Sequence, residues 1–61
     1  MIKILKRKPF SDHPEDHYLE VVLAERNNEY VTWEHNKEDG GYFLGHYFET
    51  LQNAEKDFRK R

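Results

Sequence analysis

The chain has 61 residues, no cysteine and a formal net charge of −2. This length allows a single domain with a small core, because a chain of about 60 residues buries only about 60% of the surface that it exposes when unfolded. The lack of cysteine excludes disulfides and thiolate metal sites. Charged residues make up 36% of the chain, but its 15% of aromatic residues argue against disorder.

The charges are segregated along the chain. Residues 1–8 carry four bases and no acid, and residues 56–61 carry four bases and one acid, whereas the stretch between them carries eleven acids and two bases. Such a pattern affects solubility and long-range attraction rather than fold. The first eight residues lack the apolar run of a signal peptide, and no segment reaches membrane-spanning length, so we expect a cytoplasmic protein.

The first half of the chain predicts two strands joined by a polar loop. Residues 1–8 alternate loosely between apolar and basic side chains, which is typical of a short edge strand that Pro9 ends. The polar loop over 10–17 has room for one helical turn with Pro14 at its first position. Residues 18–26 form the strongest predicted strand, and apolar residues on both of its faces indicate a central position in a sheet.

Two more strands follow. The two asparagines at 27 and 28 lie between β-rich runs and predict a tight hairpin, because Asn tolerates a positive φ. The next strand covers 29–35, and the glycines within 36–41 supply the turn to a strand over 42–48.

A single helix, from Thr50 to Arg61, ends the chain. Thr50 is a suitable N-cap, and one narrow apolar stripe runs along the helix through Leu51, Ala54 and Phe58. The sequence therefore predicts one α+β domain: a three- or four-stranded antiparallel β-meander with one C-terminal α-helix packed on one face.

The predicted register gives two apolar faces. A two-residue first turn pairs Val22 with Trp33, and a four-residue second turn pairs Trp33 with Leu44. One face then carries Val22, Ala24, Val31, Trp33, Leu44 and Phe48. The other face carries Leu19, Val21, Leu23, Tyr30, Phe43 and Tyr47.

A three-turn helix covers only one of these faces, and an exposed apolar face tends to mark an interaction site. We therefore predict that the second set is a partner-binding surface of a non-enzymatic binding or accessory protein, with a protein partner or a second copy of the chain in a homodimer. The alternative is that the N-terminal strand and the loop after it fold over this face.

An acidic inhibitor of a nucleic-acid-binding enzyme is the alternative function. The acidic middle of the chain would then imitate the charge of a nucleic acid, with Glu29, Glu34 and Glu38 among its contacts. Charge runs are more often solvated surface, and the two basic ends weaken the imitation.

Two histidines in the first loop, His13 and His17, lie among carboxylates and have the chemistry of divalent-metal ligands. Their spacing matches no established motif, and Pro14 interrupts the helix that would align them. We therefore predict no metal ligand and no cofactor.

Catalytic and nucleic-acid functions are not favoured. The chain has one serine, Ser11, and two threonines, of which Thr50 caps the helix and Thr32 lies within a strand, so no nucleophile stands beside a base. The aromatic run 42–48 resembles a base-stacking strand only faintly, and the acidic middle of the chain would repel phosphate. We expect neither an enzyme nor a nucleic-acid partner.

The C-terminal half of the chain resembles small uncharacterised bacterial and phage proteins. The resemblance implies a prokaryotic, cytoplasmic setting and one strand–strand–helix unit, and it implies no activity, cofactor or catalytic residue. The residues that carry it are Tyr30-Val31-Thr32-Trp33, Gly41, Gly45-His46-Tyr47-Phe48, Leu51, Ala54 and Asp57-Phe58.

Overall fold

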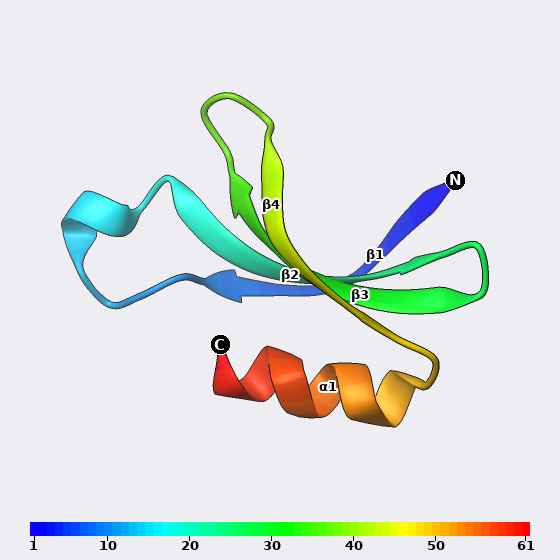
Figure 1. The fold of residues 1–61 in the computed structure, drawn as a ribbon. Helices are drawn as coiled ribbons and strands as arrows, with labels where there is room; N and C mark the ends of the chain where they lie inside the picture. The colour runs from blue at the N-terminus through cyan, green and yellow to red at the C-terminus, as the bar shows by residue number, and fades with distance from the viewer.

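The computed structural model describes residues 1–61 as a four-stranded antiparallel sheet with one helix across it (Figure 1). The strands lie side by side in chain order, so the sheet is a simple meander. The predicted fold class is therefore confirmed. The elements are β1 (Ile2–Pro9), η1 (Pro14–Asp16), β2 (Leu19–Arg26), β3 (Glu29–Asn36), β4 (Tyr42–Phe48) and α1 (Leu51–Lys60).

The first hairpin has the predicted register. Asn27 and Asn28 both have positive φ, at 52° and 67°, as the tight turn requires. Val22 accordingly pairs with Trp33. β1 pairs along the other edge of β2, which makes β2 a central strand and satisfies its backbone groups on both sides.

The helix begins where the sequence predicts. The hydroxyl of Thr50 accepts a hydrogen bond from the backbone N–H of Asn53 at 3.2 Å, which satisfies one of the free donors of the first turn. Ala54 and Phe58 are buried against the sheet, whereas Leu51, at the start of the same stripe, is 39% exposed.

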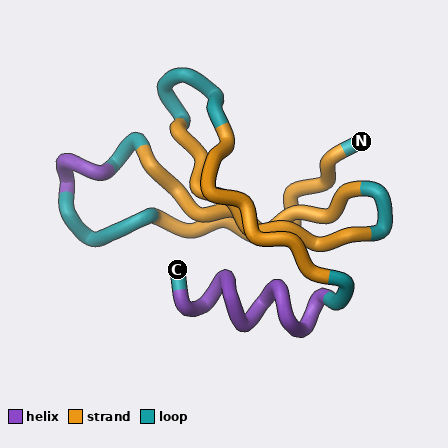
Figure 2. Tube along the Cα trace, viewed as in Figure 1, coloured by secondary structure: helices purple, strands orange, loops and turns teal.

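Two small apolar clusters lie on opposite faces of the sheet. The cluster under α1 contains Val21, Leu23, Ala54 and Phe58, with Leu5, Tyr30 and Phe48 packed around it. The other cluster contains Val22, Ala24, Val31 and Trp33, with Ile4 beside it. No other element covers this second face, which we call the open face; the uncovered side can be followed in Figure 2.

β4 departs from the predicted register at one point. Glu34 pairs with Phe43, but Thr32 pairs with His46, so β4 has one more residue here than β3. The extra residue forms a bulge at Leu44, whose φ is 53°. Beyond a bulge, the alternation of side chains is reversed.

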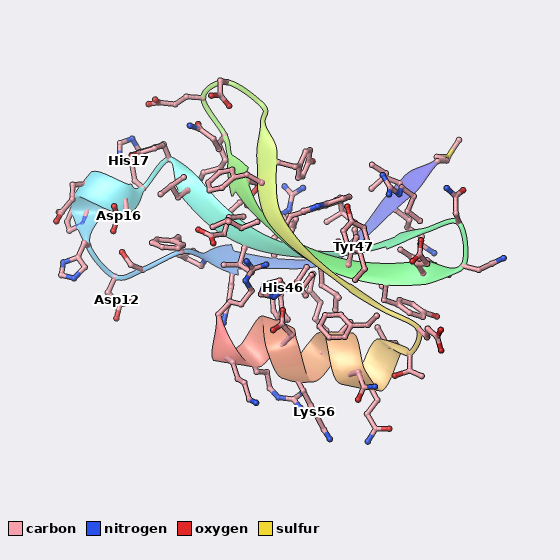
Figure 3. All side chains as sticks on the ribbon, in the orientation of Figure 1. Asp12, Asp16, His17, His46, Tyr47 and Lys56 are labelled. Atoms are coloured by element: carbon pink, nitrogen blue, oxygen red, sulfur yellow. The ribbon has the colours of Figure 1, made fainter.

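The bulge reverses the last part of β4, so two predicted positions are wrong. Tyr47 pairs with Val31 and lies on the open face, and Phe48 packs in the cluster under α1. The sequence predicted the opposite face for each. Figure 3 shows the outcome: His46 points toward α1, and Tyr47 points away from it.

Candidate functional site

A group of aromatic rings lies over the open face at its β3–β4 side. The ring centroids of Trp33 and Tyr42 are 5.0 Å apart, and those of Trp33 and Tyr47 are 6.4 Å apart with the planes nearly perpendicular. His35 stacks on Tyr42 at 4.3 Å. Such contacts hold the rings in fixed positions, so their exposed parts form a preformed surface.

Exposure differs sharply within this group. Trp33 is only 6% exposed, whereas Tyr42 and Tyr47 are 42% and 51% exposed. The indole therefore serves as the floor on which the two tyrosines rest, and the tyrosines are the parts that a partner would touch. Tyrosine is enriched at protein interfaces because it offers a large apolar ring with a polar tip.

Gly45 makes the position of the indole possible. A Cβ at this position would lie 2.5 Å from Nε1 of Trp33 and 2.7 Å from Cδ1, which is closer than real atoms approach. The glycine lets the strand backbone approach the indole ring closely, next to the bulge.

Charged groups on the open face are balanced by neighbours. The guanidinium of Arg26 lies 5.8 Å from the ring centroids of both Trp33 and Tyr47. The carboxylate of Glu20 is buried and bonded to Nδ1 of His35 at 2.6 Å, with Nε of Arg7 at 4.0 Å. The face therefore presents aromatic rings without a strong excess of either charge.

A second polar group, the Asp57 cluster, joins α1 to the other face of the sheet. Asp57 accepts hydrogen bonds from the hydroxyl of Thr32 and from Nδ1 of His46, the latter at 2.9 Å. Arg61 donates to the backbone oxygens of Thr32 and Leu44, at 2.9 Å and 2.6 Å. These four side chains, Asp57, Thr32, His46 and Arg61, make up the cluster.

The Asp57 cluster joins the helix to the sheet by hydrogen bonds. Desolvation by itself raises the pKa of Asp57, but the hydrogen bonds from Thr32 and His46 and the charges of His46 and Arg61 outweigh it and lower the pKa below its ordinary value. Thr32 is fully buried, so its hydroxyl cannot reach a substrate. The group therefore contributes to packing.

The predicted partner surface is not one surface. Val21 and Leu23 are fully buried under α1, because the helix covers the face that the sequence left free. Tyr30 packs against the same cluster, and Tyr47 lies on the opposite face because of the bulge. Val21, Leu23 and Tyr30 are therefore wrong as partner contacts, and Tyr47 is exposed on the other face.

The other two predicted contacts lie at the ends of strands. Leu19 is partly buried at the start of β2, and Phe43 is 41% exposed at the start of β4. Neither belongs to the aromatic group on the open face. Of the six predicted residues, Tyr47 is the one that an open-face partner would contact.

The histidines of the first loop do not come together around a common point. Nδ1 of His17 is 3.0 Å from the backbone oxygen of Pro14, and Nδ1 of His13 faces Glu15 at 3.8 Å. No group of three or more histidine and carboxylate side chains has the arrangement of a metal site.

Several functional contacts were not predicted from the sequence. The Glu20–His35 pair follows from the correct first-hairpin register, which places the two residues opposite each other. Arg26 also follows from the register of the first hairpin, and Tyr42 follows from its pairing with His35 across the second turn. No local sequence pattern predicts the contacts of Arg61 with β3 and β4, because these contacts join residues 17 to 29 positions apart.

Comparisons of the chain with protein-family models, with curated proteins and with solved structures found no match. The single helix α1, of ten residues, is too short to cross a membrane.

Proposed function

We propose that the protein is a non-enzymatic binding or accessory protein that acts through its open face as a homodimer. The observation that carries the proposal is the pair of half-exposed tyrosines, Tyr42 and Tyr47, held on the buried Trp33 of a sheet face that no helix covers. The residues beneath these rings are already buried, so the exposed halves of the two tyrosines are the part of this face left for a partner.

The charges of the open face favour a second copy of the chain as the partner. Arg7 lies beside Glu20, and Arg26 lies over aromatic rings, so opposite charges and rings are close together on one surface. When two such faces meet about a twofold axis, each guanidinium can reach a carboxylate or ring of the other copy. A partner whose surface carries charges of only one sign would form fewer favourable contacts with this face.

The size of the face predicts a weak dimer. Four strands of seven or eight residues, spaced about 4.8 Å apart and rising about 3.3 Å per residue, cover an area on the order of 500 Å². Two such faces bury about 1,000 Å² in total, which is at the lower limit for a specific interface. We therefore expect a dimer that dissociates on dilution.

The acidic-inhibitor alternative has less support. Glu34 faces Arg61 at 3.4 Å, and Glu55 forms an ion pair with Lys6 at 2.7 Å. These two acids are paired with bases within the chain, so the negative field offered to a basic partner is smaller than the sequence implies.

The test is sedimentation or light scattering over a range of protein concentrations. We expect the wild type to pass from monomer to dimer, and Tyr47→Glu to remain monomeric, because it removes an exposed ring from the proposed interface and places a charge there. The matched control is Phe43→Glu, which changes a similarly exposed aromatic residue of the same strand outside the open face.

A wild type that stays monomeric at high concentration would refute the homodimer. Equal weakening by Phe43→Glu would show that the effect does not belong to the open face. Circular dichroism of each variant checks that the fold is retained.

A further inference from the structure

A hollow of about 470 Å³ lies at the end of the sheet where β1 and β2 meet the first loop. Its walls come from the end of β1, the loop over 11–17, the start of β2 and the turn after β3. This volume falls within the range of small-ligand sites. The loop that encloses it projects past the end of α1 in Figure 2, and Asp12, Asp16 and His17 mark it in Figure 3.

Backbone hydrogen bonds tie the walls together. The N–H of Phe10 donates to the oxygen of Leu19 at 3.2 Å, and the N–H of Lys37 donates to the oxygen of Tyr18 at 2.8 Å. The loop is closed internally by the hydroxyl of Ser11, which donates to Asp16 at 2.7 Å. The hollow therefore exists without a ligand to shape it.

Polar side chains are frequent in the lining. Eight of its eleven residues carry polar or charged side chains, and the other three are two prolines and a leucine. A compact, charged ligand fits this lining better than an apolar one.

Two cationic residues of the lining, Arg7 and Lys37, have donors that the chain does not use. The ammonium of Lys37 has no hydrogen bond or ion pair within the chain, and the guanidinium of Arg7 has only the 4.0 Å contact with Glu20. Glu20 itself is committed to His35 at 2.6 Å. Asp12 is the other acid of the lining.

Histidine adds further donors. Nδ1 of His17 is occupied by the backbone oxygen of Pro14, which leaves its Nε2 without a partner in the chain. His13 also lines the hollow, and both rings are able to donate to an anion.

We propose that this hollow binds a small oxyanion, a phosphate or carboxylate group, with Arg7 and Lys37 as its main anchors. Guanidinium and ammonium groups form the strongest hydrogen bonds with such anions. The middle of the chain, with eleven acids and two bases, is otherwise unfavourable for anions, so these donors make the hollow a local exception. The site shares Arg7 and Glu20 with the open face but contains neither Tyr42 nor Tyr47, and it goes beyond the proposed function.

The experiment is an amide NMR titration with inorganic phosphate, with citrate in a second arm and sodium chloride at matched ionic strength as the reference. We expect saturating shifts in the loop over 11–17 and at Arg7 and Lys37. A response to phosphate alone assigns the site to phosphate groups, and a stronger response to citrate assigns it to carboxylates; either result supports an oxyanion site.

Variants distinguish a site from general charge attraction. Lys37→Gln and Arg7→Gln should each weaken binding about tenfold, since each removes a charge-assisted hydrogen bond. The matched control is Lys56→Gln, which removes the same charge from an exposed position on α1 that points away from the sheet (Figure 3). It should leave the affinity unchanged.

Three outcomes would overturn the proposal: shifts that do not saturate, shifts that chloride reproduces, or equal weakening by Lys56→Gln. An unchanged dispersion of the spectrum shows that a variant is folded, and Lys37, on a turn, is the variant least able to disturb the sheet. Tyr47→Glu should bind phosphate like the wild type, so failure of the dimer proposal would leave this one standing.

Discussion

At the scale of single residues, two small features of β4 decide which side chains reach the open face. Leu44 takes a positive φ of 53°, a conformation that costs a non-glycine residue about 1 kcal/mol or more. Gly45, next to it, gives space to the indole of Trp33. Together they turn Tyr47 toward Trp33, and so place one of the two exposed tyrosines.

Gly45→Ala is therefore expected to destabilise the fold. The new methyl group would meet ring atoms of Trp33 at 2.5 Å and 2.7 Å, and relief requires the ring or the strand to move. Overpacking of this kind costs about 1–3 kcal/mol. Chemical denaturation followed by tryptophan fluorescence measures the loss.

Gly41→Ala is the control for this prediction. Its added methyl group would meet only the flexible Asp39 side chain, at 3.1 Å, so a much smaller loss is expected. If Gly45→Ala were as stable as Gly41→Ala, the close approach of the backbone to the indole would not contribute to stability.

At the scale of elements, α1 is held on the sheet by an apolar stripe and by the Asp57 cluster. Ala54 and Phe58 supply the apolar contact, and Asp57 joins the helix to Thr32 of β3 and His46 of β4. Burial of the helix face is worth more than the polar contacts, but the polar contacts fix the angle at which the helix lies.

Asp57→Asn should lower stability by about 1–2 kcal/mol at neutral pH, since the charged acceptor is lost. The pKa of Asp57 is lowered in the folded chain from its ordinary value of 3.8, so the unfolded chain takes up this proton first as the pH falls. The stabilisation is complete above 3.8 and is lost as the pH falls through the lower pKa of the folded state.

Urea denaturation at a series of pH values tests this. The difference between wild type and Asp57→Asn should shrink in acid, while Glu49→Gln, at an exposed position without bonds, should match the wild type throughout. A difference that stays constant to well below pH 3.8 would contradict the assignment.

At the scale of the whole molecule, β2 is the strand around which both faces are built. Four consecutive residues, Val21 to Ala24, are fully buried. Val21 and Leu23 lie in the cluster under α1, and Val22 and Ala24 lie in the cluster of the open face. Both of its edges are paired, with β1 on one side and β3 on the other. The edge strands β1 and β4 each have one free edge.

Amide hydrogen exchange should reflect this arrangement. We expect the slowest exchange in β2 and the middle of β3, because these amides open only when the whole molecule unfolds. Amides of β4 near Leu44 should exchange faster, since the bulge interrupts the ladder there. Equal protection along β4 and β2 would contradict this view of the fold.

The proposed open-face dimer would bury side chains rather than strand edges. Two copies that meet face to face bury side chains and leave the strand edges free. Dimer formation should therefore change the NMR signals of the Tyr42 and Tyr47 rings more than those of any edge-strand amide. Comparison of dilute and concentrated samples by NMR measures the two effects separately.

The sequence by itself determined the elements, the first hairpin and the presence of two apolar faces, because these follow from local rules. Thr50 caps a helix and Asn27–Asn28 make a tight turn wherever they stand between such neighbours. The apolar residues on both faces of 18–26 also indicate a central strand. Each of these predictions needs only residues close together in the chain.

Only the tertiary structure decided which face the helix covers and which tyrosine lies on the other. A single extra residue at Leu44 reverses the side-chain alternation of the rest of β4. The bulge is accompanied by a close approach of Gly45 to Trp33. These two residues are 12 positions apart, and no local pattern predicts that they meet. The covered face is the one on which Ala54 and Phe58 meet Val21 and Leu23. Both choices depend on packing between distant segments, which local rules do not contain.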